Sequence, residues 1–127
     1  RDVAPSRGLG DVYKRQEEVL RELAFITALP ASAVLTAQGA SAQEAAAVQD
    51  EQVLVQGIAD LVLVFDEHAE ILDYKTDRSR DAQYYIDEYA AQLRLYRRAF
   101  APRRAVPVTK LTIYSFAIED EIDVPLA

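Results

Sequence analysis

The spacing of apolar and polar residues differs between successive parts of the chain. The first apolar segment mixes helical spacing with a β-like tail, so we predict a strand over residues 21–27 that Pro30 closes. Residues 38–51 are small and polar, and Ser41 stands three positions before Glu44, which is the spacing of a capping box. This second segment is predicted to be a loop with about one helical turn.

Apolar residues are densest between residues 52 and 75. The stretch "QVLVQGIADLVLVF" is rich in Val, Leu and Ile over two strand lengths, with Gly57 as a bulge or bend. Both faces of residues 58–65 are apolar, which predicts a strand covered on both sides. "DEHA" then turns the chain and residues 70–75 return, so the pair is predicted to be an antiparallel hairpin.

A helix is predicted over residues 82–101, where Pro102 would terminate it. The residues that recur at helical spacing are Tyr85, Tyr89, Gln92, Leu93 and Tyr96. A further strand begins after Pro107. The order strand, hairpin, helix, strand predicts a small α/β fold in which the helix covers one face of the sheet.

Composition narrows the class of protein. With 127 residues, of which 50% are hydrophobic, the chain can bury one modest core and is expected to form a single domain. It has no apolar run long enough to span a bilayer and no start resembling a signal peptide, so we expect a soluble, cytoplasmic chain. The absence of cysteine excludes disulfides, thiolate zinc sites and iron–sulfur sites, so any metal must bind to oxygen or to His68.

Charge is distributed unevenly. The net charge is −7, yet residues 74–110 contain nine basic and four acidic residues, a local balance of +5. Such a segment is typical of a phosphate-binding face, and equally of a solvated helix face. We take Arg78 and Arg80, at the end of the most unusual motif of the chain, as the candidate residues for contact with the phosphates of a nucleic acid.

That motif is "EILDYKTDRSR", which places Asp73 and Lys75 on the same face of a strand. A hairpin loop of two residues, or one of four residues at 66–69, would set Asp60 opposite Lys75 and bring all three side chains together. A three-residue loop would turn Asp60 to the far face. Two interpretations stay open: a Mg²⁺ or Mn²⁺ site beside a lysine that assists hydrolysis, or a surface salt bridge.

The helix supplies a third candidate element. Gln92 and Tyr96 are four residues apart and therefore lie one above the other on the same side of the helix. An amide and a phenol in this arrangement could steady a metal-bound water or a phosphate. Packing of the helix on the sheet is the commoner role of such a tyrosine stripe.

Together these motifs resemble a known family. "QGIAD", "DYKTD" and "QLRLY" are similar to the C-terminal nuclease domain of AddA, the helicase-nuclease subunit of bacterial AddAB, within the RecB-like PD-(D/E)XK nucleases. The flanks "RELAF" and "KLTIYSFAIEDEI" resemble that family's outer strands, so the likeness covers about residues 20–124. The resemblance implies a mixed β-sheet flanked by helices, with a partial restriction-endonuclease-like core.

The resemblance also assigns roles to residues. It implies that Asp60 and Asp73 bind the metal with the backbone carbonyl of Tyr74, and that Lys75 is catalytic. Gln92 and Tyr96 match the family's Gln-x-x-x-Tyr motif, whereas Thr76 and Asp77 complete the "DYKTD" box without an assigned role. The implied function is Mg²⁺-dependent hydrolysis of DNA, in double-strand-break repair and recombination, by a helicase-nuclease with an AddB-like second subunit.

Two departures qualify this expectation. The family usually carries a metal-ligand histidine on an upstream helix, and His68, in the predicted turn, is not a replacement. No Walker-type loop is present, so ATP is expected to act only in a helicase part outside this sequence. We therefore expect a nuclease fragment over residues 17–127.

Three further expectations follow from the sequence. Since "DVYKRQ" resembles a translated adapter remnant, residues 1–16 are interpreted as non-native or disordered. An inactive DNA-binding or subunit-docking module is the alternative function. A stand-alone resolvase or a cysteine-rich CRISPR-associated exonuclease fits less well, because of the flanks and the lack of cysteine.

Overall fold

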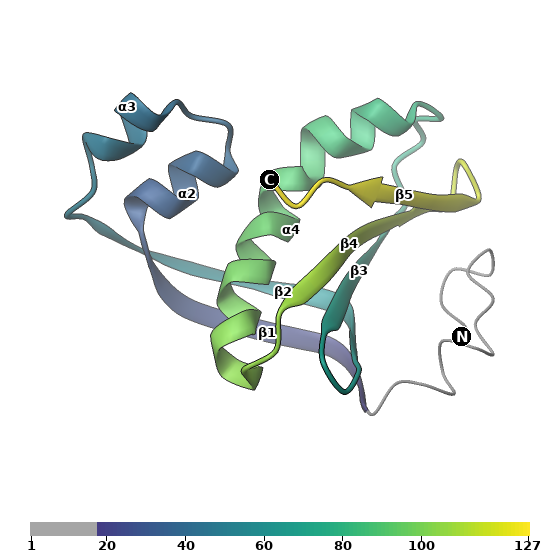
Figure 1. The fold of residues 1–127 in the computed structure, drawn as a ribbon. Coiled ribbons are helices and arrows are strands. Elements are labelled where there is room, and N and C mark those ends of the chain that lie inside the picture. Colours follow the sequence, from purple (N-terminus) through teal and green to yellow (C-terminus); the bar gives the residue numbers. More distant parts are fainter. Residues whose placement is uncertain (1–17) are drawn as a thin grey trace.

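The structure, a computed structural model, describes residues 18–127, and the predicted non-native segment 1–16 lies outside the described residues. The elements in chain order (Figure 1) are β1 (Glu18–Pro30), α2 (Ala31–Ala37), α3 (Ala42–Ala46), β2 (Gln52–Val64), β3 (Ala69–Lys75), α4 (Ala82–Arg104), β4 (Val108–Ser115) and β5 (Asp120–Val124). The predicted first strand, the capping box at Ser41 and the strand after Pro107 are all confirmed.

The strands form one mixed sheet. Its order is β1-β2-β3-β4-β5, with β3 and β4 parallel and the other neighbours antiparallel. The parallel pair requires a crossover, and α4 provides it by running across one face of the sheet (Figure 1). The predicted α/β class is confirmed, and the ends of β3 and β4 are brought together at Lys75 and Ser115.

The sheet is buried on both faces in its centre. On the face covered by α4, the core includes Phe25 and Ile71 of the sheet with Tyr85 and Leu93 of the helix. The opposite face gathers a smaller cluster of Leu61, Leu63, Phe65, Leu72 and Tyr114. Burial on both faces explains why residues 61–65 are uniformly apolar, as predicted; Ile58, also expected to be covered, is 57% exposed.

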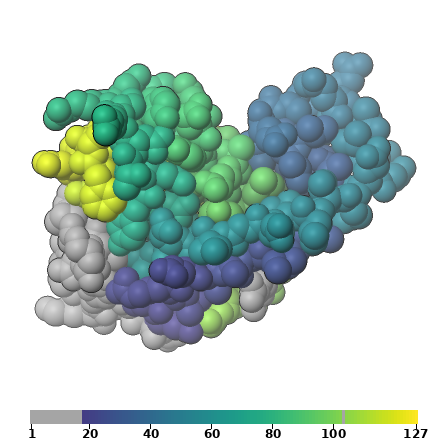
Figure 2. All heavy atoms as spheres, turned by 180° about the vertical axis from the view of Figure 1, so that it is seen from behind, coloured from purple at the N-terminus to yellow at the C-terminus, as the bar shows by residue number. Residues whose placement is uncertain are grey.

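The outer halves of β1 and β2 leave the sheet as a two-stranded arm. β2 pairs with β3 only over residues 61–64, whereas its pairing with β1 continues to Gln52. The arm leads into the short helices α2 and α3 (Figures 1 and 2), of which α2 contacts α4 and α3 packs on α2. Helix α2 was not predicted, because its seven residues are too few to establish a helical period in the sequence.

Two sequence predictions are corrected here. Gly57 is not a bulge, since β2 is one continuous strand and Gly57 pairs with Phe25 in regular register. Pro102 does not terminate α4, which runs to Arg104 with the proline inside its last turn and Ala105 in a left-handed cap at φ 57°. Proline is tolerated there because only the amide bond to the carbonyl of Arg98 is lost before the helix ends.

The hairpin register differs from the prediction as well. Val64 pairs with Ala69 and Leu61 with Leu72, so the loop is Phe65–His68 and the strands are shifted by two residues from the predicted pairing. Asp60 therefore lies across from Asp73, not from Lys75. An even shift keeps every side chain on its predicted face, so the expected gathering of Asp60, Asp73 and Lys75 is preserved.

Among the described residues, no helix combines the length and apolar character needed to cross a membrane.

Gly57 is required by the helix above it. A Cβ added at Gly57 would lie 2.7 Å from Cε1 and 2.8 Å from the hydroxyl of Tyr96, whose side chain is only 4% exposed. We expect Gly57→Ala to destabilise the fold by about 1–3 kcal/mol, because the buried ring must move. Urea denaturation measures this change in the free energy of unfolding. Gln56→Ala, at the neighbouring exposed position, is the control and should stay within about 0.5 kcal/mol of wild type; equal losses would contradict the contact.

Candidate active site

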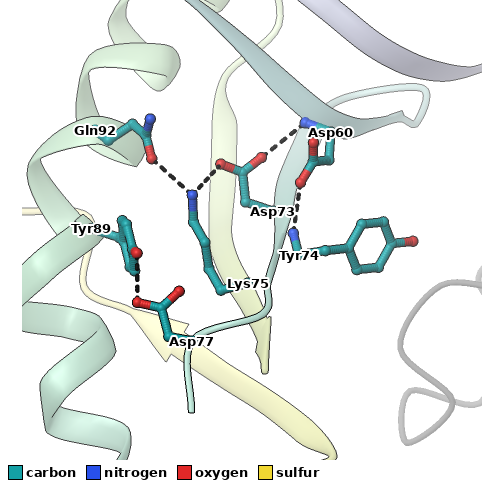
Figure 3. A network of polar contacts seen from close by, with 7 residues as sticks. All are labelled: Asp60, Asp73, Tyr74, Lys75, Asp77, Tyr89 and Gln92. Carbon is teal, nitrogen blue, oxygen red and sulfur yellow. Dashed lines mark hydrogen bonds and ion pairs between the residues drawn. The ribbon is translucent and has the colours of Figure 1, made fainter. Parts of the chain in front are cut away.

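The centre of the site is a pair of hydrogen bonds in which Asp60 on β2 and Asp73 on β3 each accept a backbone amide of the other strand. The Asp60 amide donates to Oδ1 of Asp73 at 2.8 Å, and the Tyr74 amide donates to Oδ2 of Asp60 at 2.8 Å (Figure 3). Each carboxylate thus takes a backbone donor of the opposite strand. The two acids are held across from each other by the backbone itself.

This exchange lies where β2 turns away from β3. The ladder between the two strands ends at Leu61 and Leu72, and the next cross-strand contacts are those of the carboxylates. On the other side of β2, Glu22 faces Asp60 with φ 51°, a left-handed conformation rare for a residue with a side chain. The backbone is therefore irregular around Asp60, and the hydrogen bonds of its side chain are part of what holds the strands there.

Asp73 is the buried acid of the pair. It is 2% exposed, and burial raises the pKa of its carboxyl above the ordinary value of 3.8, with the charge of Asp60 acting in the same direction. The hydrogen bond from the Asp60 amide and the charge of Lys75 lower the pKa and oppose this effect. A carboxylate that is costly to ionise is one that a cation would stabilise.

Lys75 is confined on three sides. Its Nζ lies 3.8 Å from Oδ2 of Asp73 and donates to Oε1 of Gln92 at 3.3 Å. It also lies 4.1 Å from the ring centroid of Tyr89, a cation–π distance. The sheet supplies Asp73 and Lys75, while α4 supplies Gln92 and Tyr89, so the site is assembled at the contact of the two layers.

Two roles were considered for Gln92 and Tyr96, polar contact at the site and packing of the helix, and the structure shows a different one for each residue. Gln92 reaches Lys75 and is part of the polar cluster. Tyr96 is buried, stacks on Phe25 with ring centroids 5.3 Å apart and covers Gly57. Its pKa is raised first by burial and then by the charge of Asp73, so its hydroxyl is near the acids while its ring packs the helix on the sheet.

Tyr74 and the arginines lie outside this cluster. The Tyr74 ring points away from the cluster (Figure 3). It lies near the rings of Phe116 and Tyr114. Arg78 and Arg80 are exposed in the segment between β3 and α4. The basic segment is not one continuous face, because other members line a separate cavity of about 490 Å³ beside α2: Arg94, Arg97 and Arg98.

Sequence reasoning missed the partners of Asp77. Its Oδ2 accepts hydrogen bonds from the hydroxyls of Tyr84 at 2.6 Å and Tyr89 at 2.7 Å, and these bonds lower its pKa. The buried Tyr85 hydroxyl lies 2.8 Å from the carbonyl of Asp77 and 2.6 Å from that of Ser79. The sequence feature that could have predicted these partners is the short segment between β3 and α4. It has only six residues, which forces Asp77 back onto the first turns of the helix.

His68 lies in the hairpin loop, as expected. Its ring stacks on Phe65 at 4.5 Å, and its Nε2 is 3.4 Å from Glu70. That His68 does not replace the upstream histidine stays a prediction.

The donor set fits a hard divalent cation. Within residues 18–127 no group of three or more His, Cys, Asp or Glu side chains gathers in a way that could hold a metal. The site offers two carboxylates, Asp60 and Asp73, and such a pair suits Mg²⁺, which keeps several waters and needs few protein ligands. Whether the Tyr74 carbonyl joins them stays a prediction.

The chain is similar to known proteins over most of its length. The profile of the PD-(D/E)XK nuclease superfamily matches residues 4–124. Similar curated proteins, each named as a subunit of an ATP-dependent helicase/nuclease, come from Geobacillus thermodenitrificans (32% identity over 108 residues, 78% of the chain), Limosilactobacillus fermentum (34% over 111, 82%) and Oceanobacillus iheyensis (37% over 111, 83%). The chain spans 8% of the length of each of these relatives.

The burial of Asp73 predicts a specific dependence of stability on pH. The pKa of the Asp73 carboxyl is raised in the folded state. Its contribution to the free energy of unfolding is therefore fully present below the unfolded pKa of 3.8 and is lost as pH rises through the folded pKa. Asp73→Asn keeps an oxygen for the Asp60 amide but removes the charge. With a chelator present, we expect the free energy of unfolding of Asp73→Asn to improve relative to wild type between pH 4 and pH 7, as measured by urea titration. A constant difference across this range would contradict the prediction.

Proposed function

The chain belongs to the PD-(D/E)XK nuclease superfamily, and on that premise we propose that it is the nuclease domain of a helicase-nuclease and hydrolyses DNA phosphodiester bonds with a divalent cation. The observation that carries the proposal is the placement of a buried Asp73 opposite Asp60 and beside Lys75. Two acids and a lysine at one point of a sheet are a costly arrangement for a merely structural site.

Each residue has a role in this proposal. Asp60 and Asp73 would hold Mg²⁺ or Mn²⁺, with the Tyr74 carbonyl as a further ligand. When bound, the ion would acidify a coordinated water and withdraw charge from the phosphate. Lys75, whose ammonium lies between Asp73 and Gln92, would offset negative charge that develops on the phosphate. Gln92 fixes the position of Lys75, and Tyr96 seats the helix that carries Gln92.

The wider context is proposed from the relatives. Their name couples a helicase with a nuclease, and the chain spans only a small part of them. We infer a role in DNA double-strand-break repair and recombination, in a protein whose helicase part uses ATP and which assembles with an AddB-like subunit. Lys75 and the acids are intact, which favours an enzyme over an inactive binding module.

The function is tested by cleavage of end-labelled single-stranded and duplex DNA. The assay compares the chain alone with a helicase-nuclease polypeptide that carries the chain at its C-terminus. We expect Mg²⁺-dependent cleavage that a chelator and Asp73→Ala both abolish, because a ligand is removed. Asp66→Ala, in the exposed hairpin loop, is the matched control and should cleave normally. Full activity of Asp73→Ala would refute the assignment, and DNA binding without cleavage in either polypeptide would favour the binding module.

Lys75 separates catalysis from simple ion pairing. We expect Lys75→Ala to lower the cleavage rate on the order of 10²-fold, while metal affinity is kept or increased, since a positive charge beside the ion is removed. Lys110→Ala is the control, because Lys110 forms a comparable pair with Asp123 at 3.6 Å on the surface. Lys110→Ala should lower the free energy of unfolding by at most about 1 kcal/mol and leave cleavage intact. Equal rates for Lys75→Ala and wild type would reduce Lys75 to a salt-bridge partner.

DNA contact by the segment after β3 is tested through salt dependence. Arg78→Gln with Arg80→Gln should weaken DNA binding and reduce the slope of log affinity against log salt by about 1–2, because fewer counterions are released. Arg21→Gln with Arg98→Gln removes the same charge from other exposed positions and serves as the control. Fluorescence anisotropy with a labelled oligonucleotide measures both. The same slope in the two double variants would argue against this contact.

A further inference from the structure

The helix presents a second layer of polar contacts behind Lys75. Asp77 accepts a hydrogen bond from the Tyr89 hydroxyl, and the face of the same Tyr89 ring lies 4.1 Å from Nζ of Lys75 (Figure 3). Asp77 also accepts from Tyr84, on the same Oδ2 atom, but among the described residues the hydrogen bond and ring interaction of Lys75 with α4 are with Gln92 and Tyr89, not with Tyr84. One acid therefore holds two tyrosines, of which one touches the lysine.

We propose that Asp77 and Tyr89 act as positioning residues for Lys75, with Asp77 fixing the phenol and the ring face holding the ammonium beside Asp73. This inference rests on the proposed nuclease function and adds to it a role for the last residue of the "DYKTD" motif. Lysine is long and flexible, and its ammonium needs neighbours on several sides to stay at one point.

The contacts around Nζ complement one another. Asp73 supplies charge at 3.8 Å and Gln92 supplies an acceptor at 3.3 Å, but neither closes the side of Lys75 that faces the start of α4. The Tyr89 ring closes it without competing for a proton, because an aromatic face attracts a cation electrostatically. An anchored hydroxyl restricts rotation of the ring out of that position.

A structural alternative uses the same bonds. Tyr84 and Tyr89 would then only tie the segment after β3 to α4, together with Tyr85. The two explanations differ at one point. Either tyrosine can attach the segment after β3 to α4, whereas the positioning of Lys75 depends on Tyr89 alone. Tyr84→Phe is thus a matched control, since it removes one hydrogen bond of similar length from the same oxygen.

The experiment follows Lys75 itself by NMR in the 127-residue chain labelled with ¹³C-lysine. The sequence has three lysines, Lys14, Lys75 and Lys110, and Lys75→Arg assigns the signal. Protons above an aromatic face are shielded, so the Lys75 ε-protons should resonate upfield of those of an exposed lysine. We expect Tyr89→Leu to abolish this shift and Tyr84→Phe to preserve it.

Cleavage measured in parallel should fall about tenfold or more in Tyr89→Leu and stay near wild type in Tyr84→Phe, because a displaced group is a poorer catalyst. An unchanged Lys75 signal in Tyr89→Leu, or equal effects of the two substitutions, would overturn the proposal. If circular dichroism shows that Tyr89→Leu is unfolded, Tyr89→Phe decides, with a reduced shift expected and an unaltered one overturning it. Absence of cleavage by wild type both in the chain alone and in the longer helicase-nuclease polypeptide would refute the function. The NMR comparison of wild type with Tyr89→Phe and Tyr84→Phe, which all keep the ring at position 89, still judges the positioning.

Discussion

The arrangement of this molecule depends on the two hydrogen bonds that the carboxylates of Asp60 and Asp73 accept across β2 and β3. Each carboxylate accepts a backbone amide from the opposite strand, at the point where the ladder between β2 and β3 stops. The same bonds allow β2 to leave the sheet toward the arm and hold two acids face to face. Fold and site are therefore not separable here, since a change in either carboxylate alters the junction of the strands and the donor set together.

The second constraint is the contact of α4 with the sheet. Because Gly57 has no side chain, the Tyr96 ring packs directly on β2. Helix α4 then lies close enough to the sheet for Gln92 to contact Lys75. Asp77 and the helix tyrosines fix the other end of the same interface. The polar cluster is thus enclosed between layers whose apolar packing sets its dimensions, and its electrostatics are stronger than those of a surface cluster because Asp73 is withdrawn from water.

Much of this could be predicted from the sequence, because strand patterns and the Asp73–Lys75 spacing are local. The strands, the long helix and the shared face of Asp60, Asp73 and Lys75 were predicted, although the register was two residues off. Alternating faces repeat every two residues, so an even error is invisible to a pattern argument. The roles of Gly57 and Asp77 could not be found in this way. Both depend on contacts with α4 that join residues distant in sequence, and no periodicity reports such contacts.

The left-handed Glu22 has a consequence for the molecule as a whole. Within residues 18–127, β1 is an outer strand of the sheet, thirteen residues long, and an outer strand can offer backbone groups to a strand of another chain. A regular strand of that length, next to the exposed side chains of Ile26 and Leu54, would invite edge-to-edge aggregation. The inverted residue at φ 51° interrupts the flat edge, and Glu22 and Arg21 place charges beside the break. An irregularity of this kind, at the level of the two acids, disfavours pairing of an outer strand with a strand of another chain.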